Sequence, residues 1–383
     1  MPVDAPIYLD HNATTPLLPE VVDAMLPYLR THFGNPASGH VYGARARQAV
    51  ASARAQVAAL LGCDEGEILF TSGGTEANNL AIRGVAEARE RPGQIVTTSI
   101  EHPATEQPCA WLERHGWQAT RIGVDANGQA RMDAARSAIG RGTVLVTVMH
   151  SNNETGVLQP IAALAELAHA AGAVLHSDAA QSVGKVAVNV RALGVDLLSI
   201  AGHKLYAPKG VGALYVKRGT PIAPLLLGAG HERGLRPGTE NVAAIVGLGV
   251  ACSAAVRDLE TEAARIRALR DDLWTRLVAG VPALALNGHR ADRLPNTLNV
   301  RFPRTSGISV LAGAPELAAS TGSACHEGHE SASNVILAMG VPAAAALGSV
   351  RLTLGRGTTA EEVERAADAL IAAWHGLVSA PPT

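Results

Sequence analysis

The sequence predicts an α/β protein in which a mostly parallel sheet is covered by helices on both faces and joined to a smaller α+β domain. Two observations support this. Short apolar runs alternate with segments of helical periodicity through the first half of the chain, which is typical of βαβ units and a buried parallel sheet. The pattern changes after a long helical stretch near 239–280, which indicates a second domain.

The expected elements follow in order along the chain. An Ala-rich helix over 44–62 ends at Gly62, a typical stop. A strand at 67–70 leads through a glycine turn into a helix near 75–90, and further strands are expected at 94–99, 142–149, 173–178, 196–202 and 212–216. Later strands are expected near 297–302 and 348–354, and helices near 331–339 and 360–375. We therefore divide the chain into a large domain, 14–250, and a small domain formed by 1–13 and 251–383.

Composition excludes several classes of protein. With 383 residues, of which 47% are hydrophobic, the chain can bury a large core. A net charge of −2 leaves no electrostatic footprint for nucleic acid or an anionic membrane. The four cysteines form no CxxC pair, which argues against a disulfide framework or a zinc knuckle. The N-terminus has no secretory pattern, and no apolar run reaches the roughly 18 residues of a membrane span. We expect a soluble, cytoplasmic protein.

Two neighbouring stretches, "AVLHSDAAQSVGK" and "LSIAGHKLYAPKG", carry the strongest chemical signal. Asp178 falls at the carboxyl end of a buried strand, where open α/β sheets place ligand groups, although a helix N-cap is the simpler reading of a lone aspartate. Lys204 lies among apolar residues, which favours the neutral amine used in Schiff-base chemistry, although a lone lysine is more often a surface residue. Together they indicate pyridoxal phosphate (PLP).

Three further motifs could complete such a site. "FTSGGTEANNL" places Gly74 and Thr75 between a strand and a helix, where backbone N–H groups bind phosphate. "EHPAT" places His102 just ahead of a helix, as a structural histidine or as a ring stacked on a flat cofactor. "NNETG" offers Asn153 as a hydrogen-bond donor, or as an ordinary turn residue.

Taken together, these motifs resemble the cysteine desulfurase and selenocysteine lyase family of class V, fold-type I PLP enzymes. The resemblance runs from "YLDHNATTP" to "VRLTLGRGTTAEE" and includes "GNPASGHVYG", "NNETGVLQPI", "GHKLYAPKGVG", "RPGTENV" and "GSACH" in one order. It implies a seven-stranded, mostly parallel sheet in the large domain and a small domain that carries a catalytic cysteine loop.

The resemblance also implies a role for each matching residue. Lys204 would carry PLP and move the Cα proton, Asp178 would pair with the pyridine nitrogen, and His102 would stack on the ring. Asn153 and Gln181 would bond the phenolic oxygen of the cofactor. The phosphate would be held by Gly74, Thr75 and His203, with Thr239 added from the neighbouring subunit of a homodimer. Arg356 would hold the substrate carboxylate through two parallel bonds, and Asn12 is a weaker candidate for a substrate contact.

The stretch "STGSACHEGH" contains Cys325, which matches the family's nucleophile. Small residues around it suit a mobile loop, and His326 would favour the reactive thiolate. A metal site built from Cys325, His326 and His329 is a poorer reading, because adjacent ligands fit a closed tetrahedral zinc site badly. We expect no metal.

The function implied is conversion of L-cysteine to L-alanine with a persulfide formed on Cys325, which a scaffold or carrier protein would receive for iron–sulfur cluster or thio-cofactor assembly. One position departs from the pattern of many desulfurases. Ala201 stands where they carry a phosphate-binding serine, and together with the "ACH" loop it resembles selenocysteine lyases acting on L-selenocysteine. A class V aminotransferase and a non-enzymatic sulfur-assembly partner are further alternatives.

Overall fold

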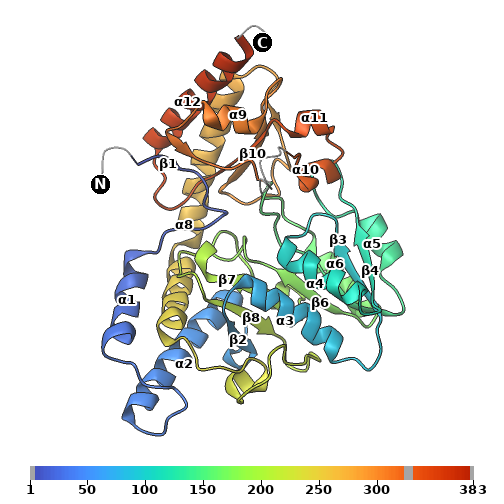
Figure 1. The fold of residues 1–383 in the computed structure, drawn as a ribbon, viewed down its shortest axis with the longest axis vertical. Helices are drawn as coiled ribbons and strands as arrows, with labels where there is room; N and C mark the ends of the chain where they lie inside the picture. Colours follow the sequence, from blue (N-terminus) through green and yellow to red (C-terminus); the bar gives the residue numbers. More distant parts are fainter. Residues whose placement is uncertain (1–4, 323–330, 380–383) are drawn as a thin grey trace.

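The computed structural model describes residues 5–322 and 331–379, and a seven-stranded sheet forms the centre of its larger part (Figure 1). The strand order is β2-β8-β7-β6-β5-β3-β4, and every neighbouring pair is parallel except the two that include β8. The strands are β2 (Ile68–Thr71), β3 (Gln94–Thr98), β4 (Gln118–Ile122), β5 (Thr143–Thr147), β6 (Val174–Asp178), β7 (Leu197–Ala201) and β8 (Gly212–Val216). The prediction of a mostly parallel seven-stranded sheet is confirmed.

Helices cover both faces of this sheet. Along β2, Leu69 packs in a cluster with α3 (Gly74–Glu87) and α4 (Pro103–Glu113), whereas Ile68 and Phe70 pack in a cluster on the other side. That second cluster is formed with α2 (Val41–Leu61), α6 (Ile161–Ala170) and the first half of α8 (Val242–Gly280). The outer helices are α1 (Pro19–Arg30), which packs on α8, together with α5 (Met132–Ala138) and α7 (Val190–Leu193). Because successive strand residues point to opposite faces, continuous apolar runs are needed to satisfy both layers.

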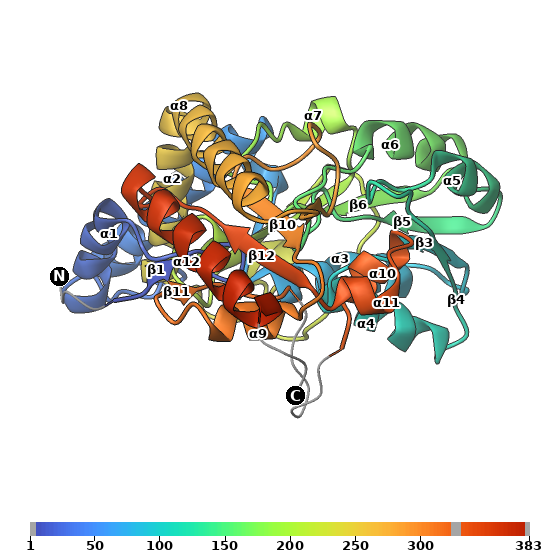
Figure 2. The ribbon, with the colours of Figure 1, turned by 90° about the horizontal axis from the view of Figure 1, so that it is seen from above.

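The C-terminal part has its own core. An antiparallel sheet of order β12-β10-β9 packs with α12 and the second half of α8, which run side by side in the view from above (Figure 2). Ile7 and Leu9 from the N-terminus belong to this core. Its elements are β1 (Ile7–Tyr8), β9 (Ala285–Leu286), β10 (Thr297–Arg301), α9 (Gly307–Ala312), β11 (Leu317–Ala318), α10 (Asn334–Ala338), α11 (Ala343–Ala346), β12 (Ser349–Thr353) and α12 (Ala360–Ser379). The domain limits 14–250, and 1–13 with 251–383, stay a proposal.

Helix α8 joins the two cores. Its residues up to Ala255 pack on the large sheet, and those from Ile266 onward pack in the C-terminal core. The expectation that no apolar run reaches membrane-spanning length was wrong, because α8 contains an 18-residue window apolar enough to span. More than half of that window is buried inside the structure, so its apolar character is explained by packing against α1 and α2.

The structure places the carboxyl ends of β2, β3, β5, β6 and β7 at one edge of the large sheet, since β2 and β7 are both antiparallel to β8. The turns after these strands carry most of the residues singled out from the sequence. Asp178 ends β6, and Lys204 follows β7 in the short 3₁₀ turn Gly202–Lys204. This edge is where open α/β sheets bind ligands.

Gly184→Ala is expected to be one of the most destabilising glycine-to-alanine substitutions at this edge of the sheet. Its φ is +77°, and an added Cβ would lie 2.0 Å from Leu205 Cδ1, one residue beyond Lys204. Overpacking of this kind costs about 1–3 kcal/mol in addition to the backbone strain. Gly172→Ala is the matched control, because φ is +75° there and nothing lies within 4 Å. Urea unfolding should show the larger loss of unfolding free energy for Gly184→Ala. Equal losses in the two variants would mean that the Leu205 side chain moves aside without lowering stability.

Candidate active site

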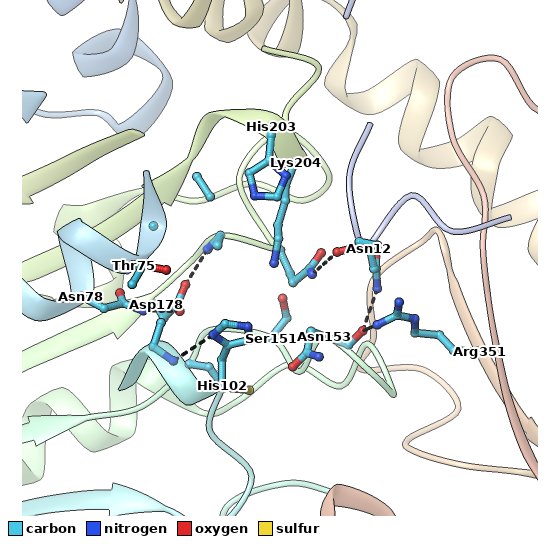
Figure 3. Close-up of a pocket in the computed structure, with 17 residues that line it drawn as sticks. Asn12, Thr75, Asn78, His102, Ser151, Asn153, Asp178, His203, Lys204 and Arg351 are labelled. Carbon is cyan, nitrogen blue, oxygen red and sulfur yellow. Dashed lines mark hydrogen bonds between the residues drawn. The ribbon is translucent and has the colours of Figure 1, made fainter. Parts of the chain in front are cut away.

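A cavity of about 280 Å³ lies at the sheet edge described above (Figure 3). It is lined by residues from the turns of the large sheet, from the N-terminal segment and from β12. Its lining includes every residue predicted for the site except Thr239, Cys325 and Arg356, namely Asn12, Gly74, Thr75, His102, Asn153, Asp178, Gln181, His203 and Lys204. Residues that sequence analysis did not select also line it, among them Asn78, Ser151 and Arg351.

Lys204 and Asp178 face this cavity from adjacent strands. Burial lowers the pKa of Lys204; the Asp178 carboxylate opposes that shift, and Arg351 adds to it. A lowered pKa increases the fraction of neutral amine, which is the nucleophilic and basic form. Asp178 accepts hydrogen bonds from Asn78 Nδ2 at 2.6 Å and from the Ala180 backbone N–H at 2.9 Å. These bonds fix the carboxylate without supplying a cation, so its charge is available to a ligand.

His102 is the N-cap of α4, and its ring lies beside the cavity (Figure 3). Nδ1 accepts a hydrogen bond from the Ala104 backbone N–H at 3.0 Å, which places the hydrogen of the neutral ring on Nε2. Burial, and then the charge of Lys204, lower the pKa of His102. The ring is thus held neutral and in one orientation, as stacking on a flat cofactor requires.

The N-terminus of α3 supplies an anion-binding turn. Gly73 is the N-cap, with φ +152° and no side-chain capping bond, and Gly74 and Thr75 begin the helix. Backbone N–H groups in a first helical turn have no partner within the helix, and the helix dipole favours an anion there. His203 lies on the same cavity, and burial with the nearby lysines lowers its pKa to about 4. Ala201, the position that departs from the pattern of many desulfurases, also lines the cavity.

Asn12 and Gln181 are held together on the opposite side of the cavity. Gln181 Nε2 donates to the main-chain oxygen of Asn12 at 2.9 Å. Asn12 is 1% exposed, and its Nδ2 donates to the Asn153 carbonyl at 3.1 Å. Beside Asn153, Asn152 Oδ1 accepts from the Glu154 and Thr155 backbone N–H groups, which organises the loop and leaves the Asn153 side chain at the cavity.

The structure places the predicted carboxylate clamp, Arg356, away from this cavity. One guanidinium nitrogen of Arg356 lies 2.7 Å from Asp258 Oδ2, and the other donates to the Ala254 carbonyl at 3.3 Å. Arg351 lines the cavity instead and is 6% exposed. Arg351 is the one charged residue of β12, between Val350 and Leu352, and this was the signal that could have identified it.

Arg351 keeps N–H groups for a ligand. Its two terminal nitrogens donate to the Asn153 carbonyl at 3.2 Å and to Asp10 Oδ1 at 2.7 Å. Its Nε is buried without a hydrogen-bond partner among the described residues. A buried unpaired donor is costly, and a carboxylate bound in the cavity would satisfy it. We therefore replace Arg356 by Arg351 in the proposed carboxylate contact.

For two of the predicted residues, the structure describes no contact with the cavity. Thr239 is exposed and does not line the cavity of its own chain, so a contribution to a partner's site stays a prediction. Cys325 lies outside the described residues, as do the neighbouring positions 323–330. The nucleophile prediction is therefore carried forward as a proposal.

Comparison with known proteins identifies the family. The aminotransferase class-V model matches residues 7–366. The chain belongs to this family. A cysteine desulfurase of Trichormus azollae is 45% identical over 94% of this chain and 90% of its own length. A solved NifS-like protein superposes with a TM-score of 0.90 at 34% identity, over 98% of this chain and 99% of that one. SspA, solved in complex with cysteine, gives a TM-score of 0.80 at 34% identity over 91% of this chain and 98% of its own.

Class V enzymes of the desulfurase group are PLP-dependent, and the predictions of fold-type I, of this enzyme group and of PLP are confirmed. The cavity fits that cofactor on its own evidence. It combines a buried lysine of lowered pKa, a carboxylate whose hydrogen bonds come from uncharged groups and a helix N-terminus without a side-chain cap. The selenocysteine lyase alternative is not favoured, since the curated relative reported above is named a cysteine desulfurase.

Glu154 is a buried carboxyl beside the site. It accepts a hydrogen bond from the hydroxyl of Ser333, the N-cap of α10, and a Cβ added to Gly322 would lie 3.0 Å from its Oε2. Burial raises the pKa of Glu154 to about 7, and the bond from Ser333 and the charge of Arg351 oppose that shift. This carboxyl therefore bonds Ser333 on one side of 323–330 and lies near Gly322 on the other.

Glu154→Gln is expected to flatten the dependence of stability on pH. Because the folded pKa of about 7 exceeds the ordinary value of 4.5, the stability contributed by this carboxyl is present below pH 4.5 and is lost as the pH rises through 7. Glutamine cannot ionise, so the variant should match wild type near pH 4 and be more stable above pH 7, by up to about 3 kcal/mol. Urea midpoints measured against pH test this. The exposed Glu316 provides a control substitution, and a constant difference across the range would contradict the prediction.

Proposed function

We propose that this protein is a PLP-dependent cysteine desulfurase that converts L-cysteine to L-alanine and passes the sulfur to Cys325 as a persulfide. The observation that carries the proposal is one cavity in which Lys204, Asp178 and His102 come together from three strand ends, opposite the buried Arg351. The expected product is sulfur for iron–sulfur cluster or thio-cofactor assembly.

The residues of the large sheet would hold the cofactor. Lys204 would carry it, Asp178 would pair with its ring nitrogen, His102 would stack on its ring, and the first turn of α3 with His203 would hold its phosphate. When bound, PLP supplies an electron sink that allows bonds at the substrate Cα and Cβ to break. Lys204, whose lowered pKa favours the free amine, would accept the Cα proton and return it.

Arg351 would bind the substrate carboxylate. Its guanidinium is fixed by Asp10 and the Asn153 carbonyl, and its Nε has no partner in the described ranges 5–322 and 331–379. Charge-assisted bonds to a carboxylate are strong and directional. The amino acid would then lie with its carboxylate at β12 and its Cα towards Lys204.

Cys325 would act as the nucleophile towards the substrate sulfur. Its thiolate forms an S–S bond with that sulfur while the substrate Cβ–S bond breaks, so the bonding electrons pass to the carbon fragment. That fragment takes up protons and leaves as L-alanine, and the persulfide stays on Cys325. A sulfur-acceptor scaffold or carrier protein would then receive the sulfur.

The assembly and location of the protein belong to the same proposal. We infer a homodimer in which Thr239 of each subunit reaches the phosphate site of the other. Its exposure in the described chain is compatible with that role. We also propose a cytoplasmic location, with no nucleic-acid or membrane partner.

The test measures alanine and sulfide release from L-cysteine with a thiol reductant, beside selenide release from L-selenocysteine. Wild type is compared with Cys325→Ser and with the control Cys63→Ser, whose cysteine is half-buried and absent from the cavity lining. We expect turnover of cysteine that collapses only in Cys325→Ser. No alanine from cysteine would reject the desulfurase function, and full activity in Cys325→Ser would reject the nucleophile.

A further inference from the structure

Lys185 is a buried cation that the reaction described above does not use. It follows the turn after β6 and is 9% exposed. Its Nζ donates to Gln181 Oε1 at 2.9 Å and lies 3.4 Å from Asn12 Oδ1. No ion pair links Lys185 to a carboxylate in the part of the chain that the structure describes. The groups that act on it are Lys204 and Arg351, both cationic, and both lower its pKa in addition to burial.

Burying a lysine without a carboxylate partner lowers the free energy of unfolding, because the charge loses its hydration. A structural lysine would normally reach water through its long side chain or pair with an acid. Lys185 does neither, and it adds a positive charge beside two others. The presence of a lysine at this position is therefore explained by the side chains that its hydrogen bonds orient.

The shorter of those bonds orients one side-chain amide of the cavity wall. The Lys185 amine donates hydrogens, so the amide oxygen of Gln181 turns towards it. The Asn12 amide is held independently, because its Oδ1 accepts from Asn296 Nδ2 at 3.0 Å and its Nδ2 donates to Thr297 Oγ1 at 2.9 Å. The nitrogen of Gln181 is then directed to the Asn12 carbonyl and to the cavity that Gln181 lines. Without that donor, the amide of Gln181 could turn over and present an oxygen to the ligand.

We propose that Lys185 is a positioning residue of the active site, whose amine holds Gln181 with its N–H group towards bound PLP. The inference rests on the proposed cofactor site and deepens it. Gln181 has one Nε2 hydrogen bonded to Asn12 and one left for the phenolic oxygen, and Lys185 determines which end of the amide is offered.

The test compares Lys185→Met, Gln181→Leu and the double variant with wild type. Lys217→Met is the matched control, because the half-exposed Lys217 pairs with the buried Asp196 and is absent from the cavity lining. Each protein is freed of cofactor and titrated with PLP, and the absorbance of the bound cofactor is followed against pH. These readouts do not require desulfurase activity.

Lys185→Met should weaken PLP binding about tenfold, the worth of one good hydrogen bond. The pH midpoint of the cofactor absorbance should rise, since a positive charge near Lys204 has been removed. If Lys185 acts through Gln181, the affinity losses will not add, and Lys185→Met will cost less than twofold in the Gln181→Leu background.

Several outcomes would overturn the inference. Wild-type affinity and spectrum in Lys185→Met would do so, as would fully additive losses in the double variant. If Lys185→Met fails to fold, Lys185→Gln, which keeps an N–H donor without the charge, is measured in its place and must lie between wild type and Gln181→Leu. Wild type that binds PLP but releases no alanine would refute the proposed desulfurase while leaving the Lys185 comparison readable.

Discussion

Lys204→Ala is expected to lower kcat/KM for L-cysteine by at least about 10³-fold, because one residue both carries the cofactor and moves the Cα proton. The lysine emerges from a 3₁₀ turn against the end of β7, and burial already lowers its pKa. No other lysine lines the cavity among the described residues. The loss should therefore not be recovered by a neighbouring amine.

A covalent readout separates this role from a loss of folding. Borohydride reduction of the loaded wild type should leave the cofactor attached after denaturation, and Lys204→Ala should retain none. Lys217→Met is again the matched control. Covalent retention in the alanine variant would mean that another lysine, with Lys185 the first to examine, carries the cofactor.

Arg351→Ala is expected to raise KM for L-cysteine about 100-fold, the cost of losing a charge-assisted contact to the substrate carboxylate. Arg356→Ala should change KM less than threefold, because its guanidinium is committed to Asp258 and the Ala254 carbonyl. Arg351→Lys keeps the charge but not the fork of N–H groups, and it should fall between the alanine variant and wild type.

Steady-state kinetics on the three variants decides between the two arginines. A larger effect on KM from Arg356→Ala than from Arg351→Ala would restore the assignment made from the sequence. Equal PLP affinity in both alanine variants is the necessary control, since the comparison then reports substrate binding alone.

The sequence alone predicted the parallel sheet and most of the cavity, because those features are encoded locally. Apolar runs determined the buried strands. Gly74, His102 and Lys204 lie in the turns that follow strands, and Asp178 ends a strand. Strands that run in one direction end at one edge, so their following turns meet without further information. The weakly apolar edge strand β4 was missed for the same reason, because only one of its five residues is buried.

Only the tertiary structure decided which arginine reaches the cavity and what Lys185 contacts. Arg351 and Arg356 lie five residues apart in one motif, and local pattern cannot rank them. The pairing of β12 with β10, and the bridge from Asp10 to Thr353, turn Arg351 inward. The contact between Lys185 and Asn12 joins positions far apart in the chain. Such contacts depend on how separate segments pack, which no single stretch of sequence specifies.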